Sequence, residues 1–226
     1  MALLGNAAML LWYDIVAEDI AAHDAWHTRE HFPERVGIPG FLRAQRWVAA
    51  AMASPRYFVV YEVTDIDVLS AGPYLDRLNH PTPWTRRIMP SFRGMTRGFC
   101  NIRQRHGTVL GSSALNIRFT TALADKPRLE SWLEQALSAL MQRDGVASAF
   151  WLESGAAPEM TREQSIRGRD AGLDQVLLVT GYSGRAIDEL AAGDLSARAL
   201  IEQGAVPDAA LGVHHLACLA NSPSMP

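Results

Sequence analysis

Three histidines are spaced four residues apart in the segment HDAWHTREHF: His23, His27 and His31. Residues four apart share one face of an α-helix, so a helix here would stack the three imidazoles on one side. Three interpretations are open: hydrogen-bonded histidines without a chemical role, an acid or base in a pocket, and a metal site. The order H-D-A-W-H is not the H-E-x-x-H of zinc peptidases, so no metal is predicted.

Two ion pairs are expected near these histidines. Arg46 shares a strand face with the apolar positions of 42–48, and an arginine there needs an anionic ligand or a carboxylate such as Glu62. We favour an internal Arg46–Glu62 pair but keep Arg46 as a substrate-binding candidate. Glu30 diverges from its neighbour His31 by about 100° on a helix, so a surface pair of Glu30 with Arg35 is predicted instead.

The segment NHPTPW is a second candidate binding region. Its prolines stiffen an irregular connection, and such connections commonly carry binding groups. Asn79, His80 and Trp84 are therefore substrate-binding candidates. Packing of Trp84 in the core is the alternative interpretation.

The first half of the chain has the pattern strand, helix, strand, strand, helix, strand. An acidic start and Pro33 delimit the first helix, which places His31 in its last turn, and Pro39-Gly40 permits the sharp turn that follows. Apolar alternation and β-branched runs mark the strands. The predicted strands are 9–16, 41–50, 57–65 and 94–106, with helices at 18–32 and, interrupted by prolines, at 67–92.

The second half repeats this order. Leucines at helical spacing mark the first helix, and a polar loop is expected at 155–172. The strands are predicted at 113–122, 146–154, 174–183 and 211–220, and the helices at 125–145 and 184–204. Two successive β-α-β-β-α-β units predict an α+β chain of two tandem ferredoxin-like units, 1–106 and 107–226.

The composition excludes several classes of protein. A net charge of −3 without a basic, aromatic-interleaved surface argues against nucleic-acid binding. Two cysteines, Cys100 and Cys218, form no disulfide framework or zinc motif. No apolar run is long enough for a membrane span, and the start of the chain lacks the basic region of a signal peptide, so a cytoplasmic location is predicted. Phosphate-binding, dinucleotide and haem-attachment motifs are absent from the sequence, and no cofactor is predicted.

The stretch WHTREHFPERVGIPGFLRAQRW, followed by SPRYFVVYEV and HPTPWTRR, resembles bacterial proteins of the dimeric α/β-barrel superfamily. The shared pattern is Trp, Glu-His, Pro-Glu-Arg, Pro-Gly-Phe and then a basic strand. The superfamily includes EthD-like proteins, antibiotic-biosynthesis-type monooxygenases, muconolactone isomerases, small polyketide cyclases and haem-dependent relatives. The resemblance covers residues 9–106; beyond them only the order of elements matches.

This resemblance implies an architecture. Two four-stranded antiparallel sheets would pack into an α/β barrel with the helices outside, here within one chain that arose by tandem duplication. Closing the barrel removes exposed sheet edges. A homodimer is expected because members of the superfamily usually associate.

The resemblance also implies a function. It favours His31 as the catalytic histidine and His27 as the second candidate, with His23 at the surface and a pocket shared with 79–84. The hypothesis is a cofactor-independent enzyme acting on a small, largely apolar carbonyl, lactone or aromatic compound, of the isomerase, lyase, cyclase or monooxygenase type. The alternatives are a non-catalytic small-molecule-binding protein and a haem-binding protein with a histidine as axial ligand.

Overall fold

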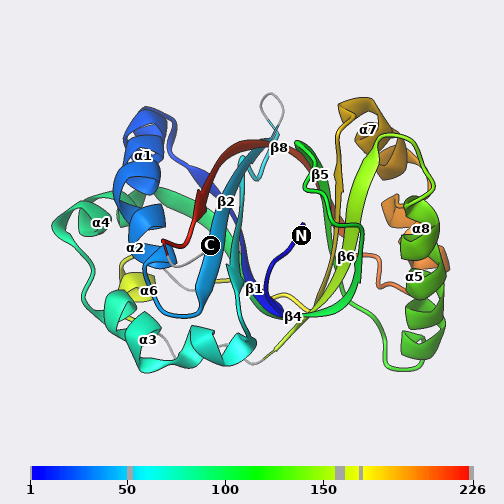
Figure 1. Ribbon diagram of the computed structural model, residues 1–226, viewed down its shortest axis with the longest axis horizontal. Coiled ribbons are helices and arrows are strands. Elements are labelled where there is room, and N and C mark those ends of the chain that lie inside the picture. The colour runs from blue at the N-terminus through cyan, green and yellow to red at the C-terminus, as the bar shows by residue number, and fades with distance from the viewer. Residues whose placement is uncertain (1, 50–52, 156–160, 168–169, 224–226) are drawn as a thin grey trace. The chain divides into compact units, whose positions relative to one another are not determined.

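The computed structural model describes residues 2–49, 53–155, 161–167 and 170–223, which divide into two compact units (Figure 1). The N-terminal unit comprises Leu4–Asn101, Gly155–Gly172 and Ala217–Pro226. The C-terminal unit comprises Met1–Leu3, Ile102–Ser154 and Leu173–Leu216. These units are not the contiguous segments 1–106 and 107–226, because the connection after residue 154 returns to the N-terminal unit.

The N-terminal unit has one antiparallel sheet of four strands. These are β1 (Ala7–Ile15), β2 (Phe41–Ala49), β3 (Tyr57–Val63) and the first part of β4 (Phe92–His106). Pairing of β1 with both β3 and β4, and of β2 with β3, gives the order β4-β1-β3-β2. This is the order of a ferredoxin-like sheet, and all four strands lie where the sequence predicts them.

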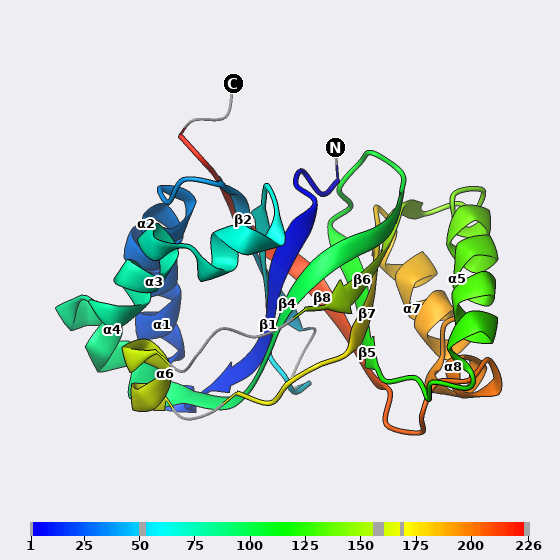
Figure 2. The same ribbon diagram turned by 90° about the horizontal axis from the view of Figure 1, so that it is seen from below.

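Helices cover one face of this sheet (Figure 2). They are α1 (Ile20–Trp26), α2 (Phe32–Val36), α3 (Gly72–Asn79), α4 (Pro83–Ile88) and α6 (Arg162–Arg167), with 3₁₀ turns at Ala17–Asp19, Ile66–Ser70 and Met89–Ser91. The predicted end at Pro33 is wrong, since a π-helical turn, His27–His31, joins α1 to α2 and Pro33 lies in the first turn of α2. The helix continues through the residue before the proline, where Phe32 N donates to His27 O in the wider π pattern. Such π turns are frequent at functional sites.

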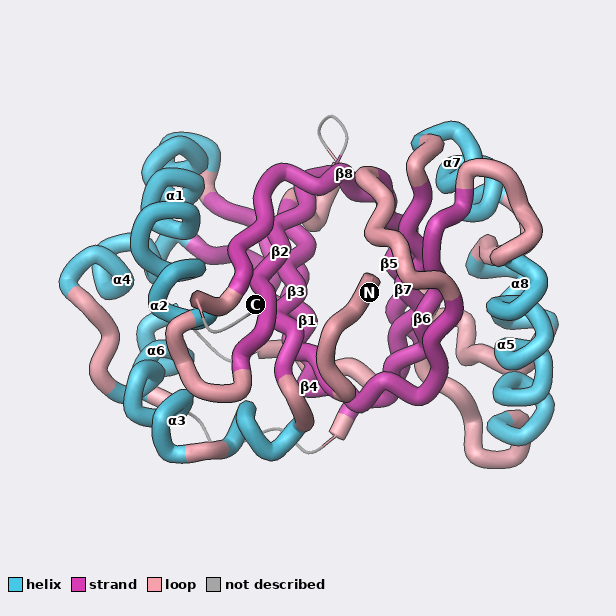
Figure 3. Tube along the Cα trace, viewed as in Figure 1, coloured by secondary structure: helices cyan, strands magenta, loops and turns pink. Residues whose placement is uncertain are grey.

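The C-terminal unit has the same organisation (Figure 3). Its strands β5 (Ser113–Phe119), β6 (Val146–Ser154), β7 (Gln175–Gly181) and the first part of β8 (Ala210–Asn221) pair in the order β8-β5-β7-β6. Its helices are α5 (Lys126–Leu140), α7 (Gly184–Ala192) and α8 (Ala197–Glu202). The leucines of α5 are buried, as their spacing predicts. The packing of the two sheets into one barrel, and a duplication as their origin, stay predictions.

The expected loop 155–172 is in part a helix, α6, and it packs on the N-terminal unit. Its ends bind the backbone of β4: Gly155 N donates to Phe99 O at 2.7 Å, and Ala171 N donates to Met95 O at 2.9 Å. The contact was not predicted because the segment is polar and is held largely by hydrogen bonds and ion pairs, so it lacks the apolar pattern of a packed helix. Within the described residues, no helix is long and apolar enough to cross a membrane.

The turn before β2 depends on the backbone conformation of Gly40. Gly40 has φ +90°, and a Cβ added there would lie 2.5 Å from Cγ2 of Val68. Gly40→Val is therefore expected to lower the free energy of unfolding by about 1–3 kcal/mol, measured by urea denaturation. Gly72→Val is the control, because nothing lies within 4 Å of a Cβ at Gly72. Equal stability of the two variants would contradict the strain argument.

Candidate functional site

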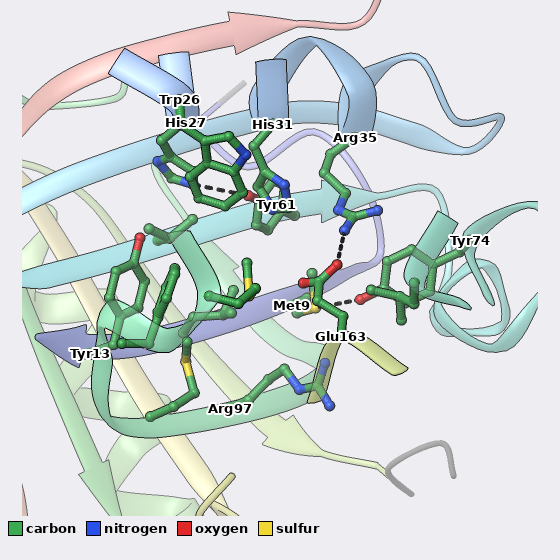
Figure 4. A pocket seen from close by; sticks show the side chains of 16 residues that line it. Met9, Tyr13, Trp26, His27, His31, Arg35, Tyr61, Tyr74, Arg97 and Glu163 are labelled. Atoms are coloured by element: carbon green, nitrogen blue, oxygen red, sulfur yellow. Dashed lines mark hydrogen bonds and ion pairs between the residues drawn. The ribbon is translucent and has the colours of Figure 1, made fainter. Parts of the chain in front are cut away.

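A pocket lies in the N-terminal unit between the sheet and its helices (Figure 4). Because side chains alternate along a strand, β1 directs Met9, Leu11 and Tyr13 to this face, and β3 directs Val59 and Tyr61. The cavity has a volume of about 30 Å³, room for one or two water molecules. Most of its wall is apolar, so each polar group in it has a strong local effect.

The three histidines stack along the helix, as the spacing predicts. The ring centroids of His23 and His27 are 5.1 Å apart, and those of His27 and His31 are 5.5 Å apart. All three are buried, at 0%, 3% and 7% exposed. The predicted surface position of His23 is wrong, because this entire helix face packs on the sheet and His23 binds Tyr13 Oη at 3.1 Å. Of the three, His27 and His31 line the pocket.

His27 is held in its neutral form. Burial lowers its pKa well below the ordinary value of 6.5, and His23 and His31 lower it further. Its Nε2 is 3.2 Å from the hydroxyl of Tyr61, whose pKa burial raises well above 10. Its Nδ1 is buried and has no hydrogen-bond partner in the described part of the chain. A neutral imidazole with one unsatisfied nitrogen is thus built into the pocket wall.

This burial predicts a pH dependence of stability. In the unfolded chain His27 takes up a proton near pH 6.5, whereas in the folded chain it does so only well below that pH. Stability that is fully present above pH 6.5 is therefore lost as the pH falls from 6.5 towards the pKa of His27 in the folded chain. We expect His27→Gln to reduce the loss of stability between about pH 7 and pH 5, measured by urea denaturation. His80→Gln, at a histidine whose side chain is 70% exposed, should leave it unchanged. A His27 imidazole that titrates near pH 6.5 by NMR would contradict the argument.

His31 lies beside a carboxylate. Its Nδ1 is 3.8 Å from Oε2 of Glu34, and its ring centroid is 4.3 Å from that of Trp26. Burial raises the pKa of Glu34, although Arg35 lowers it. Because the chain stays helical as far as Val36, the predicted place of His31 in a last helical turn is wrong, and the partial negative charge of a helix C-terminus does not lie beside it. The nearby group that would stabilise a protonated His31 is Glu34.

Two arginines enter the pocket, each paired with a carboxylate of the α6 region. Arg35 Nη2 donates to Glu163 Oε2 at 2.7 Å, and Arg97 Nε is 2.9 Å from Asp170 Oδ2. Arg35 and Glu163 point toward each other in Figure 4. The predicted Glu30–Arg35 pair is wrong. Sequence reasoning missed Glu163 because the helix that brings it to the pocket lies in the expected loop.

Glu30 instead accepts a hydrogen bond from Thr82 Oγ1 at 2.6 Å. Thr82 caps α4, so this bond ties the histidine helix to the α4 helix. Glu30 is thus a structural link beside the pocket.

Arg46 does not line the pocket, and its predicted pairing with Glu62 is wrong. Arg46 Nη1 lies 3.4 Å from Asp24 Oδ1, while Arg43 Nε donates to Glu62 Oε1 at 2.6 Å. An irregularity in β2 between Phe41 and Arg43 sets Arg43 opposite Glu62. Alternation holds from Arg43 to Val48, so the two arginines lie on opposite faces as predicted. The register of β2 against β3, shifted at this irregularity, decides which of them meets Glu62.

Asn79, His80 and Trp84 do not line the pocket either. Asn79 Oδ1 accepts from the backbone N of Arg162 at 3.3 Å, and His80 pairs with Asp76 at 3.0 Å on the surface. Trp84 packs against the core, as the alternative interpretation had it. The preceding helix α3 provides Tyr74 and Leu78 to the pocket instead. The described residues contain no group of three or more His, Cys, Asp or Glu side chains suited to a metal ion.

Comparisons with known proteins identify the fold. Neither a family model nor a curated protein sequence matches the chain. Among solved structures, an anthrone oxidase-like protein matches with a TM-score of 0.70 and 8% identity, over 99% of this chain and 97% of the other. Candidate monooxygenases of Fusobacterium nucleatum subsp. nucleatum (TM-score 0.60, 6% identity, 97% and 96% covered) and Lactobacillus acidophilus (0.59, 10%, 96% and 96%) are also similar.

A further similar structure is a ferredoxin fold protein related to antibiotic biosynthesis monooxygenases from Listeria monocytogenes, with a TM-score of 0.51, 7% identity and 95% and 96% covered. At identities of 10% or less, these similarities establish the fold alone. The chain therefore has an α+β, ferredoxin-like fold. The similarities do not distinguish the EthD-like branch from the others.

Proposed function

We propose that the chain is a cofactor-independent enzyme that removes a proton from a small, largely apolar carbonyl, lactone or aromatic compound bound in this pocket. The observation that carries the proposal is the pair of buried, stacked histidines beside a buried arginine in one apolar cavity. Proton transfer by a positioned imidazole typically accelerates a reaction by about 10²–10⁴-fold.

His31 is the proposed base, and His27 is the second candidate. A proton on His31 would be stabilised by Glu34, whose Oε2 is 3.8 Å from Nδ1. Among the described residues no carboxylate forms an ion pair with His27, and burial keeps His27 neutral. Glu34 beside His31 therefore makes His31 the better place for the transferred proton.

Room for a substrate must come from side chains that can move. Met9, Met89 and Met95 line this cavity of about 30 Å³, which by itself has room for only one or two waters. Methionine is unbranched and has three rotatable bonds, so it adapts to a ligand at low cost. An apolar ring compound would replace methionine contacts with contacts of its own.

Loss of a proton leaves an electron-rich enolate or phenolate. Returning the proton to a different carbon gives isomerisation, and attack of the carbanion on an internal carbonyl gives cyclisation. With dioxygen as co-reactant, the same anion is open to oxygenation. The similarity to an anthrone oxidase-like protein and to monooxygenases supports the last outcome.

The test is turnover of a panel of enolisable ketones, lactones, phenols and anthrone by purified protein, followed by absorbance and by oxygen consumption. We expect oxygen-dependent turnover of at least one phenol or anthrone without added cofactor. No turnover of any member, combined with saturable binding of several, would replace the proposal with a non-catalytic binding protein.

A haem-binding function has weaker support. The macrocycle is far larger than the described cavity of about 30 Å³. An absorption spectrum with a Soret band after addition of haemin would nevertheless overturn our assignment of the pocket to smaller ligands. A homodimer and an EthD-like ancestry are proposed from the sequence resemblance, and tandem duplication from the repeated order of elements. A cytoplasmic location completes the proposal.

A further inference from the structure

Arg35 is a buried cation with unused hydrogen-bonding capacity. Its side chain is 2% exposed, and Nη2 is engaged by Glu163. Nη1 is buried and has no hydrogen-bond partner among the described residues. A buried N–H without a partner has lost its hydrogen bond to water, so a ligand oxygen that accepts from Nη1 recovers a hydrogen bond.

Each arginine at the pocket already has a carboxylate partner among the described residues. Glu163 pairs with Arg35, and Asp170 pairs with Arg97. Glu34 adds a third carboxylate beside His31, and His27 is held neutral. Two cations and three carboxylates leave an excess of negative charge among the described residues of the site. An anionic ligand would therefore bury a negative charge with no unpaired cation among these residues, which is strongly unfavourable.

We propose that the pocket selects neutral ligands that carry a hydrogen-bond-accepting oxygen, with Arg35 as the donor to that oxygen and Glu163 as the residue that excludes carboxylates. The proposal deepens the proposed function and rests on its pocket.

The charge balance also fits proton transfer. A neutral substrate and a neutral His31 would become an anion and an imidazolium, so the net charge of the pocket would not change. The new negative oxygen would lie at Arg35 Nη1, and the new positive ring would lie 3.8 Å from Glu34. Both charges would appear beside groups that stabilise them in a site of low dielectric.

The experiment is calorimetric titration of the full chain with two probes of similar shape, acetophenone and benzoate. The wild type is expected to bind acetophenone at least about tenfold more tightly than benzoate. Glu163→Gln keeps an acceptor for Arg35 but leaves its charge unbalanced. We expect this variant to bind benzoate about tenfold more tightly than the wild type does, with acetophenone affinity within about threefold.

Two further variants complete the test. The double variant Arg35→Gln with Glu163→Gln removes both charges of this pair, so the pocket has its wild-type net charge again. It should lose the gain in benzoate affinity. Glu202→Gln changes the protein's net charge equally but lies in an exposed pair with Arg198 on α8 of the C-terminal unit, so it should behave as the wild type. Thermal unfolding of each variant establishes that it is folded.

Equal wild-type affinity for the two probes, binding of neither, or unchanged benzoate affinity of folded Glu163→Gln would overturn the proposal. The wild-type comparison is sufficient by itself if Glu163→Gln does not fold. Selective binding of acetophenone without turnover of the substrate panel would refute the enzymatic function and leave the charge selectivity standing.

Discussion

Replacing His31 with glutamine is expected to lower kcat at least about a hundredfold for a substrate identified by the panel, with little change in KM. Glutamine fills similar space and forms hydrogen bonds, but its amide does not accept a proton at neutral pH. Steady-state kinetics of the purified variant measure both constants. His31 lines the pocket and is 7% exposed, so the substitution acts at the cavity wall.

Two variants control for this experiment. His80→Gln changes a histidine outside the pocket and should retain wild-type kcat. His27→Gln tests the second candidate. A large loss in His27→Gln with unchanged kcat in His31→Gln would transfer the role of base to His27 and leave the pocket assignment intact.

Arg43→Met is expected to lower the free energy of unfolding by about 3–5 kcal/mol at neutral pH. Glu62 is fully buried, and Arg43 binds it through Nε at 2.6 Å and Nη2 at 3.1 Å. Gln45 and the backbone N of Leu4 also donate to this carboxylate. Removing Arg43 leaves a buried carboxylate without its cation. Urea denaturation measures the loss.

The pH dependence of this variant has a defined sign. Burial raises the pKa of Glu62 above 4.5, and Arg43 opposes this rise. Without Arg43 the pKa of Glu62 rises further, so its protonation relieves the unpaired charge as the pH falls. The stability deficit of Arg43→Met should therefore shrink from neutral pH towards pH 4.5.

The control variants separate the buried charge from the loss of the side chain. Arg198→Met, in an exposed i,i+4 pair with Glu202, should cost no more than about 1 kcal/mol. Adding Glu62→Gln to Arg43→Met should restore part of the stability, because an amide buries no charge. A deficit that does not depend on pH would contradict the role of the Glu62 charge.

Local patterns in the sequence predicted the order of strands and helices in the two β-α-β-β-α-β units, because hydrophobic periodicity indicates which face of an element is buried. Helical spacing likewise put His23, His27 and His31 on one face, and the Pro-Gly pair identified the turn at Gly40. Each of these inferences depends on neighbours within a few residues.

Only the tertiary structure decided which polar groups meet. A local irregularity in β2, invisible to simple alternation, gave Glu62 to Arg43 rather than to Arg46. Docking of the histidine helix on the sheet buried His23, and α6 brought Glu163 to an arginine 128 positions away. Contacts between segments so far apart depend on how whole elements pack and on strand register, which no short pattern encodes. The shared helix face of the histidines could therefore be predicted from the sequence, whereas the ion pairs that set the charge of their pocket could not.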